Sequence, residues 1–368
     1  MSRTPRAALA ALAAAGLLLA ACGGDKKSSD STTPSVPPTA VVTAAPTTTP
    51  ATTSTVAATT STAAATTTTA APQPVMPLTG LPITDPAVAQ RQALVVKIDN
   101  HPLARPQSGL GVADLVYEEN VEQLTRFAAV FQTNEPEPVG PIRSGRTQDV
   151  MLLGSLNKPI FAWSGGNGGV TAAINGSDFF VVRVDANQFA GLDGVYRAKD
   201  RQSPHNLYAS GSKLFSLSPD GAEPPPQQFQ YLAAGATPAG DDSTGVDLAM
   251  DGVKVGWSYD AGAGGYARAQ DGKPHVDREN GPITAKNVVV LTVDYQPSAV
   301  DANSPEAQTI GTGDVTVYTG GKAVSGTWTR ADRTDVFHLT AADGTPIKLT
   351  PGNTWVELAR AGASSPST

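Results

Sequence analysis

The segment from residue 23 to about residue 75 constrains the fold most, because it cannot supply a hydrophobic core. Ala, Thr, Ser and Pro dominate it, and the run TAAPTTTPATTSTVAATTSTAAATTTTAAPQP has no aromatic residue and no apolar periodicity. Such a segment buries too little surface to offset the entropy lost on ordering. We therefore predict a disordered tether over 22–75 and expect the folded part to begin near Met76.

A basic and then apolar segment at the start of the chain predicts export and lipidation. Arg3 and Arg6 precede an apolar run over 7–20, which is too short to span a bilayer as a helix. The run ends in Leu-Ala-Ala-Cys, which resembles the lipobox of bacterial lipoproteins. We predict a lipoprotein signal peptide over 1–21 and lipidation of Cys22. The alternative is a secretory peptide with an incidental cysteine.

Cys22 is the only cysteine of the chain, so it cannot form an internal disulfide or a cysteine metal cluster. A diacylglyceryl group supplies two acyl chains, which is what stable membrane attachment requires. We expect a protein that is lipid-anchored to the cell membrane on its extracytoplasmic face. Loss of Arg3 and Arg6 would take the formal net charge from −7 to −9 (−7 − 2). A chain this acidic is a poor general binder of nucleic acid.

Strand-like and helix-like runs alternate over 76–220, which indicates an N-terminal α/β domain with a mixed sheet. The strand-like runs are ALVVKID (93–99), the segment 114–121, RFAAVFQ (126–132), PIFAWSG (159–165) and FFVVRVD (179–185). The helix-like runs are SGRTQDVMLLGSLN (144–157) and GVTAAIN (169–175). Ser144 is the expected N-cap of the first of these helices.

The pattern changes after three consecutive prolines at 224–226, which cannot lie inside a helix or a central strand. We predict a linker over 221–244. Short β-branched and aromatic runs follow, separated by turns such as Asp271-Gly272 and Asp343-Gly344. They predict a smaller, mainly antiparallel β-domain over 245–360, followed by a disordered tail over 361–368.

Long motifs of this chain resemble one family. They are IDNHPLARPQSGL with ADLVYEE, TRFAAVFQ with VGPIRSGR, YRAKDRQSPHNLY, and GYARAQDGKPHVD with VYTGGKAVSGTW. Together they are similar to the YerB-type lipoproteins of Gram-positive bacteria, whose two domains carry the designation DUF3048. The resemblance covers about 78–358. It implies a two-domain envelope protein on a lipid anchor, and it implies no particular reaction.

A polar loop follows the strand-like run that ends at Asp99. Asn100, Arg105 and Gln107 lie in this loop, and ligands of open α/β sheets bind outside the carboxyl ends of strands. We predict that these three residues contact a ligand. The alternative is a loop in which Asn100 and Gln107 satisfy backbone groups and Arg105 pairs with an acid such as Glu118.

Arg143, Ser144 and Arg146 flank an expected helix start. Free backbone N–H groups and the positive end of the helix dipole attract anions there, and guanidinium groups add paired donors. We predict that these residues bind a carboxylate or a phosphate. The alternative is internal pairing of the arginines with an acid, for which the candidates are Asp149, Glu118 and Glu119.

The motif YRAKDRQSPHNLY supplies further candidates: Arg197, His205 and Asn206. A cationic loop beside a histidine is suited to hold an anion and move protons, so His205 is the one candidate catalytic residue. Ser203 lacks a nucleophile elbow, which argues against a Ser–His hydrolase. The run SGGNGG (164–169) resembles a phosphate loop but lacks the Gly-Lys-Ser/Thr ending.

The histidines are too far apart in the sequence to indicate a metal site. Only His275 and Asp277 form a close His/carboxylate pair, and one pair is not a site. We predict no metal and no cofactor.

Two classes of function fit these observations. In the first, the protein is a non-catalytic envelope module. It binds an anionic group of the cell wall, of a lipid or of a polymer, or it binds a protein of wall synthesis. In the second, it is a hydrolase or transferase acting on such a substrate through His205 and the arginines. We favour the first, because no complete nucleophile–base–orienter set is visible. One wall of the predicted cleft is formed by Asn100, Arg105, Gln107, Arg143 and Arg146.

Overall fold

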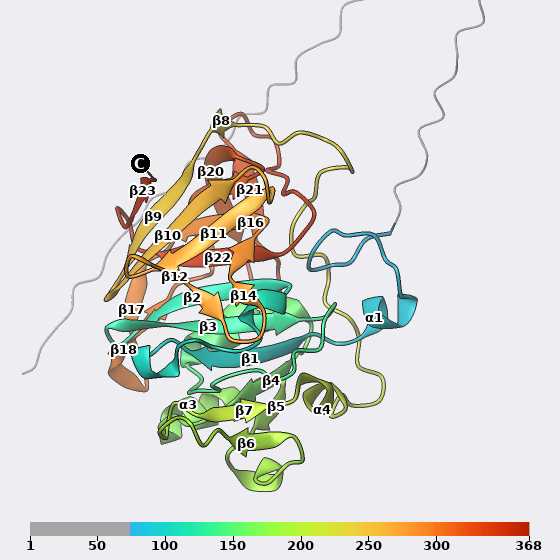
Figure 1. Ribbon diagram of the computed structural model, residues 1–368, viewed down its shortest axis with the longest axis vertical. Coiled ribbons are helices and arrows are strands. Elements are labelled where there is room, and N and C mark those ends of the chain that lie inside the picture. The colour runs from blue at the N-terminus through green and yellow to red at the C-terminus, as the bar shows by residue number, and fades with distance from the viewer. Residues whose placement is uncertain (1–73, 368) are drawn as a thin grey trace, which may run out of the picture. The chain divides into compact units, whose positions relative to one another are not determined.

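Eleven strands form one mixed sheet at the centre of residues 74–367, the part of the chain that the computed structural model describes (Figure 1). From edge to edge the strands are β21 (His338–Ala341), β20 (Lys322–Arg330), β19 (Gly311–Thr319), β16 (Asn287–Thr292), β22 (Thr354–Ala359), β2 (Leu115–Val121), β3 (Leu124–Phe131), β1 (Leu94–Asp99), β4 (Ile160–Trp163) and β5 (Phe180–Arg183). The short strand β8 (Asp241–Asp242) pairs with β20 beside this row.

The two halves of the described chain meet inside this sheet. Strand β2 from the first half pairs in parallel with β22 from the second half, and Glu118 lies opposite Glu357 in their register. The predicted fold class is confirmed, because parallel and antiparallel strands mix in the large sheet and smaller antiparallel sheets accompany it. The two regions predicted as separate domains nevertheless share one sheet, which no local pattern in the sequence indicates.

A smaller sheet of six antiparallel strands packs on part of the large one. Its strands are β12 (Lys273–Pro274), β11 (Gly265–Gln270), β10 (Val253–Asp260), β9 (Gly245–Met250), β23 (Ser364–Pro366) and β15 (Thr284–Ala285), the last paired with β11. Asp271 and Gly272 both have positive φ in the predicted turn after β11, as a tight hairpin requires. The tail predicted to be disordered differs from the structure, because β23 pairs with β9.

The remaining elements are short. Three two-stranded sheets are formed by β6 (Val195–Arg197) with β7 (Leu207–Ala209), β13 (Val276–Asp277) with β14 (Gly281–Pro282), and β17 (Tyr295–Ser298) with β18 (Asp301–Ala307). The helices are α1 (Pro86–Gln90), α2 (Thr147–Leu152), α3 (Gly168–Asn175) and α4 (Gly211–Phe215), with 3-10 turns η1 (Pro102–Ala104), η2 (Leu110–Val112), η3 (Leu153–Leu156) and η4 (Asn187–Phe189). No helix within 74–367 has the length and apolar character needed to cross a membrane.

Helix α2 begins later than the sequence predicts. Arg146, not Ser144, occupies the N-cap position, and the Asp149 carboxylate accepts a hydrogen bond from the Arg146 backbone N–H at 2.6 Å. The residues before it are committed to the sheet, because the Arg143 N–H donates to the Lys97 carbonyl at 2.9 Å. The prediction of Ser144 as N-cap was therefore wrong, since tertiary pairing holds this segment extended.

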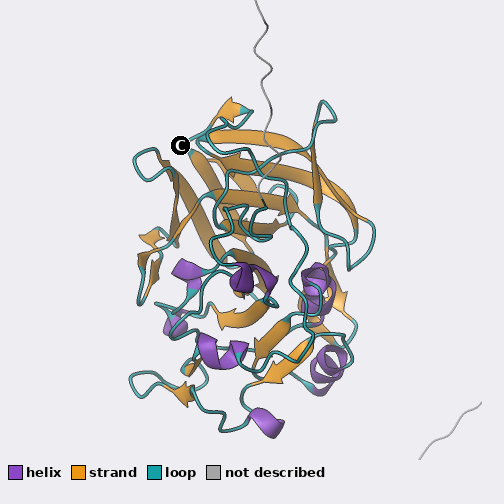
Figure 2. Ribbon diagram, turned by 90° about the vertical axis from the view of Figure 1, so that its right-hand side faces the viewer, coloured by secondary structure: helices purple, strands orange, loops and turns teal. Residues whose placement is uncertain are grey.

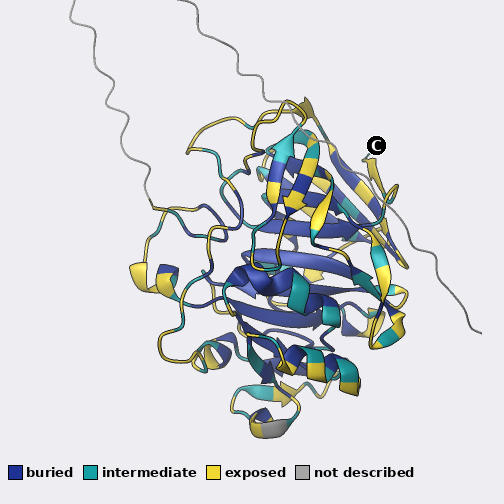
Figure 3. Cartoon of the chain, turned by 180° about the vertical axis from the view of Figure 1, so that it is seen from behind, coloured by how far each residue is buried: buried dark blue, intermediate teal, exposed yellow. Residues whose placement is uncertain are grey.

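The central strands are covered on both faces, which explains their unbroken apolar runs. All six residues of β1 are buried (Figure 3). On one face Val95 packs in a cluster with Leu152 of α2 and Ile174 of α3. On the other face Phe127 packs in a cluster with Trp257 of the smaller sheet. The helices gather around one half of the molecule, and the other half is formed mainly by strands (Figure 2).

A charged residue ties the two sheets together. Arg268 of β11 is buried between them, and its guanidinium donates to the Glu118 carboxylate of β2. The guanidinium carbon lies 5.0 Å from the ring centroid of Trp355, 5.5 Å from that of Phe127 and 5.8 Å from that of Trp257. The aromatic faces and the carboxylate together compensate the loss of hydration of this cation.

Replacing Arg268 should destabilise the fold strongly. Arg268→Met leaves the buried Glu118 carboxylate without its cation, which typically costs about 3 to 5 kcal/mol. Urea unfolding followed by tryptophan fluorescence measures the loss. Arg278→Met is the control, because Arg278 pairs with Asp200 at the surface, and its stability should stay close to that of the wild type. Equal stability of the two variants would show that Arg268 does not join the sheets.

Candidate functional site

The site lies where the parallel strands β1 and β4 separate. They pair from Leu94 to Val96 of β1, and beyond that point the segment 141–143 lies between them. The Asp99 N–H donates to the Pro141 carbonyl, and the Ser164 N–H donates to the Arg143 carbonyl, both at 2.9 Å. Strand carboxyl ends that diverge in this way form the usual ligand position of open α/β sheets.

Three arginines, which we call the arginine cluster, gather at this position: Arg126, Arg143 and Arg146. Arg126 lies opposite Asp99 in the pairing of β3 with β1 and is 8% exposed. The Nε atoms of all three arginines are buried and have no hydrogen-bond partner within residues 74–367. Burial, and then the charges of Arg146 and Arg143 against the opposing charge of Asp99, lower the pKa of Arg126 to about 10.

Acidic side chains pair with two of these arginines. Arg143 Nε lies 3.6 Å from Asp99 Oδ2, which is beyond hydrogen-bond distance, and Arg146 Nη2 lies 2.6 Å from Glu122 Oε2. Internal pairing was the alternative for both arginines, but the acids are not those expected. Arg126 has no ion pair within the described residues, and its Nη1 donates to the Ser144 carbonyl at 3.3 Å.

His205 is held beside the arginine cluster. Its Nδ1 lies 2.6 Å from Asp99 Oδ2, and its ring stacks on that of His101 with centroids 4.2 Å apart. Asp99 is almost fully buried, and it also accepts a hydrogen bond from the His101 N–H at 3.1 Å. Burial, and then the neighbouring His205, hold the pKa of His101 below its ordinary value. The carboxylate thus fixes the orientation of the His205 ring.

A group of buried charged residues, which sequence reasoning missed, lies next to the arginine cluster on the same face of the large sheet. Lys97 is fully buried and contacts the carboxylates of Glu119 and Asp149, the latter at 2.6 Å from Nζ. Burial lowers the pKa of Lys97 to about 8. The missed signal is a charge within an apolar strand run, as at Lys97 and Arg126. A charge buried on a covered sheet must find a partner there.

Asn100 and Gln107 do not reach the arginine cluster, contrary to the predicted cleft wall. Both are fully buried, and the Gln107 amide donates to the Asp99 carbonyl and to Asn100 Oδ1. Asn100 Nδ2 donates to Thr125 Oγ1 at 2.6 Å. Arg105 donates to the Asn100 side chain and pairs with Asp271 at 2.9 Å. All three residues therefore brace the polar loop against the smaller sheet, as in the alternative.

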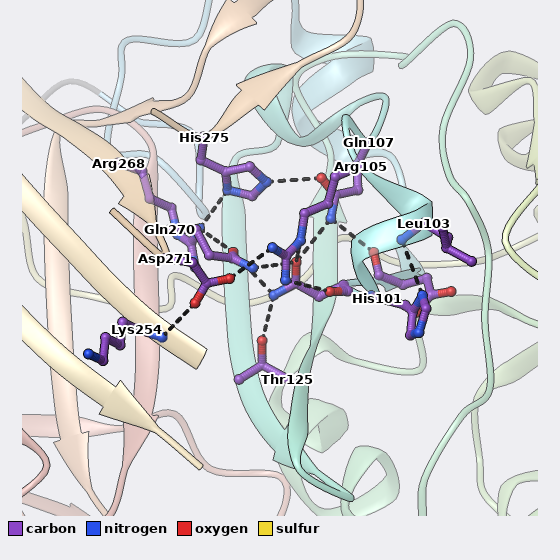
Figure 4. Close-up of polar contacts among 12 residues, drawn as sticks. His101, Leu103, Arg105, Gln107, Thr125, Lys254, Arg268, Gln270, Asp271 and His275 are labelled. Carbon is purple, nitrogen blue, oxygen red and sulfur yellow. Dashed lines mark hydrogen bonds and ion pairs between the residues drawn. The ribbon is translucent and has the colours of Figure 1, made fainter. Parts of the chain in front are cut away.

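The polar contacts continue between the sheets (Figure 4). Gln107 Oε1 lies 2.9 Å from His275 Nε2, and Arg268 Nη1 contacts both His275 and Gln270. Burial, and then the charges of Arg268 and Arg105, hold the pKa of His275 well below its ordinary value. These groups are paired mainly with one another in a closed interior, with Arg268 Nε the one donor of the guanidinium that has no partner within 74–367. The enclosure favours a scaffold role for this network.

The remaining candidates lie elsewhere. Arg197 donates to Asn206 Oδ1 at 2.9 Å, and Asn206 Nδ2 donates to the carbonyls of Ala198 and Arg201. This pair braces the loop between β6 and β7. The SGGNGG run is a strand-to-helix turn in which Asn167 caps α3. Within 74–367, no three His, Cys, Asp or Glu side chains are grouped as metal ligands. Cys22 lies outside the described residues.

Glu357 lies at the far end of the buried network. Its Oε1 accepts a hydrogen bond from Trp257 Nε1 at 2.8 Å, and its Oε2 is buried with no partner among the described residues. Burial, and then the charge of Glu118, raise the pKa of Glu357 well above its ordinary range. Burial and the neighbouring Glu118 carboxylate therefore both disfavour the ionised form of Glu357.

Comparisons with known proteins agree with this fold. The chain belongs to the DUF3048 family of unknown function: residues 78–221 match its N-terminal domain and residues 246–356 its C-terminal domain. It is 32% identical over 305 residues to "Putative lipoprotein YerB" of Bacillus subtilis (strain 168), covering 77% of this chain and 85% of that protein. The crystal structure of YerB protein from Bacillus subtilis superposes with a TM-score of 0.69 at 26% identity, covering 80% of this chain and 100% of that one.

Glu357→Gln should flatten the pH dependence of stability. The folded chain keeps the Glu357 proton to a higher pH than the unfolded chain, in which the carboxyl group has its ordinary pKa of 4.5. Its contribution is therefore fully present below pH 4.5 and is lost as the pH rises through the raised folded value. Gln keeps an acceptor for Trp257 and removes the titration.

The free energy of unfolding of both chains, measured by urea titration from pH 4.5 upward, checks this expectation. The difference between them isolates Glu357 from His275, whose titration both chains share. Glu135→Gln removes an exposed carboxyl group and should leave the wild-type profile. A wild-type loss of stability that persists in Glu357→Gln would contradict the assignment.

Proposed function

We propose that this protein is a membrane-anchored extracytoplasmic lipoprotein that binds an anionic group at the arginine cluster without catalysis. The Leu-Ala-Ala-Cys motif at Cys22 and the relative named as a lipoprotein support the anchor. The observation that carries the binding role is the set of three buried Nε atoms of Arg126, Arg143 and Arg146, none of which has a hydrogen-bond partner within 74–367. Buried donors on cations normally have acceptors, and a carboxylate or phosphate would supply them.

The electrostatics support this assignment. Three guanidinium groups repel one another, and the acids at Asp99 and Glu122 each meet only one of them at ion-pair distance. Arg143 also keeps part of its side chain exposed, at 26%, so an incoming anion has a route to it. An added negative charge would relieve the repulsion and bind most strongly between the three groups. Chemical sources of such a charge include a cell-wall fragment, an anionic lipid and an acidic patch of an envelope protein.

A second candidate function, hydrolysis or group transfer, rests on one observation. The Asp99–His205 contact of 2.6 Å has the geometry in which a carboxylate orients a catalytic imidazole. A nucleophile would have to stand at the opposite ring nitrogen, and no hydroxyl group within 74–367 hydrogen-bonds to His205. Binding is therefore the better-supported function.

Arg143→Ala should weaken anion binding while leaving the fold intact. Calorimetric titration with inorganic pyrophosphate, phosphate and citrate provides the probes. Loss of one charge-assisted contact should weaken the best of them roughly tenfold or more. The melting temperature should fall by no more than about 3 °C, because Asp99 retains His205 as a partner.

Arg333→Ala is the matched control for Arg143→Ala. Arg333 is 24% exposed and ion-paired with Asp178 at 2.7 Å, so it resembles Arg143 in exposure and charge, and its replacement should leave binding unchanged. If anion binding weakened equally in both variants, the effect of Arg143→Ala would be due to the change in net charge and not to a contact with the anion. If the wild-type chain bound none of the probes and Arg143→Ala lost much stability, the arginine cluster would have only a structural role.

Cys22→Ala should release the protein from the membrane. The thiol is the attachment point for the acyl chains, and the two chains account for stable anchoring. Cells that produce each chain are fractionated and immunoblotted. The wild-type chain should be found in the membrane pellet and Cys22→Ala in the soluble fraction. Retention of Cys22→Ala in the pellet would show that something other than lipid holds the protein there.

A further inference from the structure

A cavity of about 510 Å³ opens between the β6–β7 pair and the turn that joins β13 to β14. Tyr196 and Arg197 line it from β6, Tyr208 from β7, and Arg278 and Glu279 from the turn. This volume lies within the range of about 300 to 1,000 Å³ that is typical of small-molecule sites. The cavity is built from both halves of the chain, which no sequence pattern brings together.

Two tyrosines give the cavity an aromatic wall. The rings of Tyr196 and Tyr208 are stacked, with centroids 5.8 Å apart and an interplanar angle of 19°. Tyr196 is 47% exposed, whereas Tyr208 is buried behind it. The Tyr208 hydroxyl is also buried and has no hydrogen-bond partner in the part of the chain that the structure describes. An exposed ring held flat by a buried one is a preformed stacking surface.

The charges around this wall favour an anion. Arg197, Lys199 and Arg278 line the cavity as cations, and Asp200 and Glu279 line it as acids. Arg278 is paired with Asp200 at 2.9 Å, and Arg197 donates to an uncharged amide. Lys199 is exposed and forms no ion pair within 74–367. The chain as a whole carries a net charge of −7, so a local excess of cations marks this wall as distinct.

We propose that this cavity binds an acidic saccharide. The apolar C–H face of a pyranose ring would lie on Tyr196, and a carboxylate substituent would meet Lys199 and Arg197. The carboxylate oxygens of Glu279 would accept hydrogen bonds from sugar hydroxyl groups. An aromatic wall, cations and acids in one hollow match a ring that carries hydroxyl groups and one negative charge.

This site goes beyond the arginine cluster. The imidazole of His205 contacts Asp99, whereas Tyr208, three residues further along, lines the cavity. None of the three arginines of the cluster lines it. The cavity therefore needs its own ligand and its own test.

Two sugars that differ by one acidic group test the proposal on the full chain. N-acetylmuramic acid carries a carboxylate-bearing lactyl group that N-acetylglucosamine lacks. Calorimetry or ligand-observed NMR should show the acidic sugar binding at least roughly threefold more tightly. Tyr196→Ala should weaken its binding roughly fivefold, and Tyr196→Phe should retain it, because the ring is what stacks.

Charge variants separate specific contact from net charge. Lys199→Gln should weaken binding of the acidic sugar roughly threefold, so that its affinity comes close to that of the neutral sugar. Lys348→Gln removes an exposed charge from the segment beside β21, at the other end of the large sheet, and should have no effect. Arg143→Ala should also leave sugar binding unchanged, which keeps this test independent of the arginine cluster.

Several results would overturn the proposal. Equal binding of the two sugars, or no binding of either by the wild type, removes the acidic saccharide as ligand. Full binding by Tyr196→Ala removes the stacking wall. Loss of binding in Arg143→Ala would place the sugar at the arginine cluster instead of in this cavity.

Discussion

The buried ion pair between Arg268 and Glu118 is the interaction on which the two-sheet architecture depends. It joins a strand of the smaller sheet to a central strand of the large one, and three aromatic rings surround the guanidinium. A charge pair removed from water stabilises a fold only when further groups satisfy its remaining donors and acceptors. The chain supplies these through His275, Gln270 and Gln107, and the same bonds extend to the loop after β1. Sheet packing and the position of the polar loop are therefore one energetic unit.

The opposite face of the large sheet carries a second group of buried charges, in which the cations are less completely paired with acids. Lys97 is enclosed by Glu119 and Asp149, while Arg126 above it lacks an acid at ion-pair distance within the described residues. Side chains alternate along a strand, so neighbours such as Glu118 and Glu119 serve opposite faces. The interior face is closed, and atoms that it leaves without hydrogen-bond partners within 74–367, such as Arg268 Nε and Glu357 Oε2, are enclosed between the two sheets. The helix face ends at diverging strands where Arg143 keeps part of its side chain exposed, and this access is why we place binding there.

Predictions from periodicity succeeded where the local chain decides the outcome, and failed where distant segments meet. The strand runs that end at Asp99 and that contain Arg126 formed as expected, because burial on both faces favours unbroken apolar sequence. Ser144 failed as a helix cap because the backbone around Arg143 pairs with β1. Arg105 lay within the predicted site but turned to Asp271, a partner more than 160 residues away in the sequence. No reading of the polar loop alone contains that partner.

The sequence by itself determined the mixed and antiparallel strand character and the family, since composition and short-range pattern express both of them. Only the tertiary structure decided which polar residues pair between the two sheets and which gather at the diverging ends of β1 and β4. That choice follows from the pairing of β2 with β22 and from the packing of the small sheet on the large one, contacts between residues far apart in the chain. The free energy of a buried charge depends on the partners that surround it in space, and those partners are set by the fold.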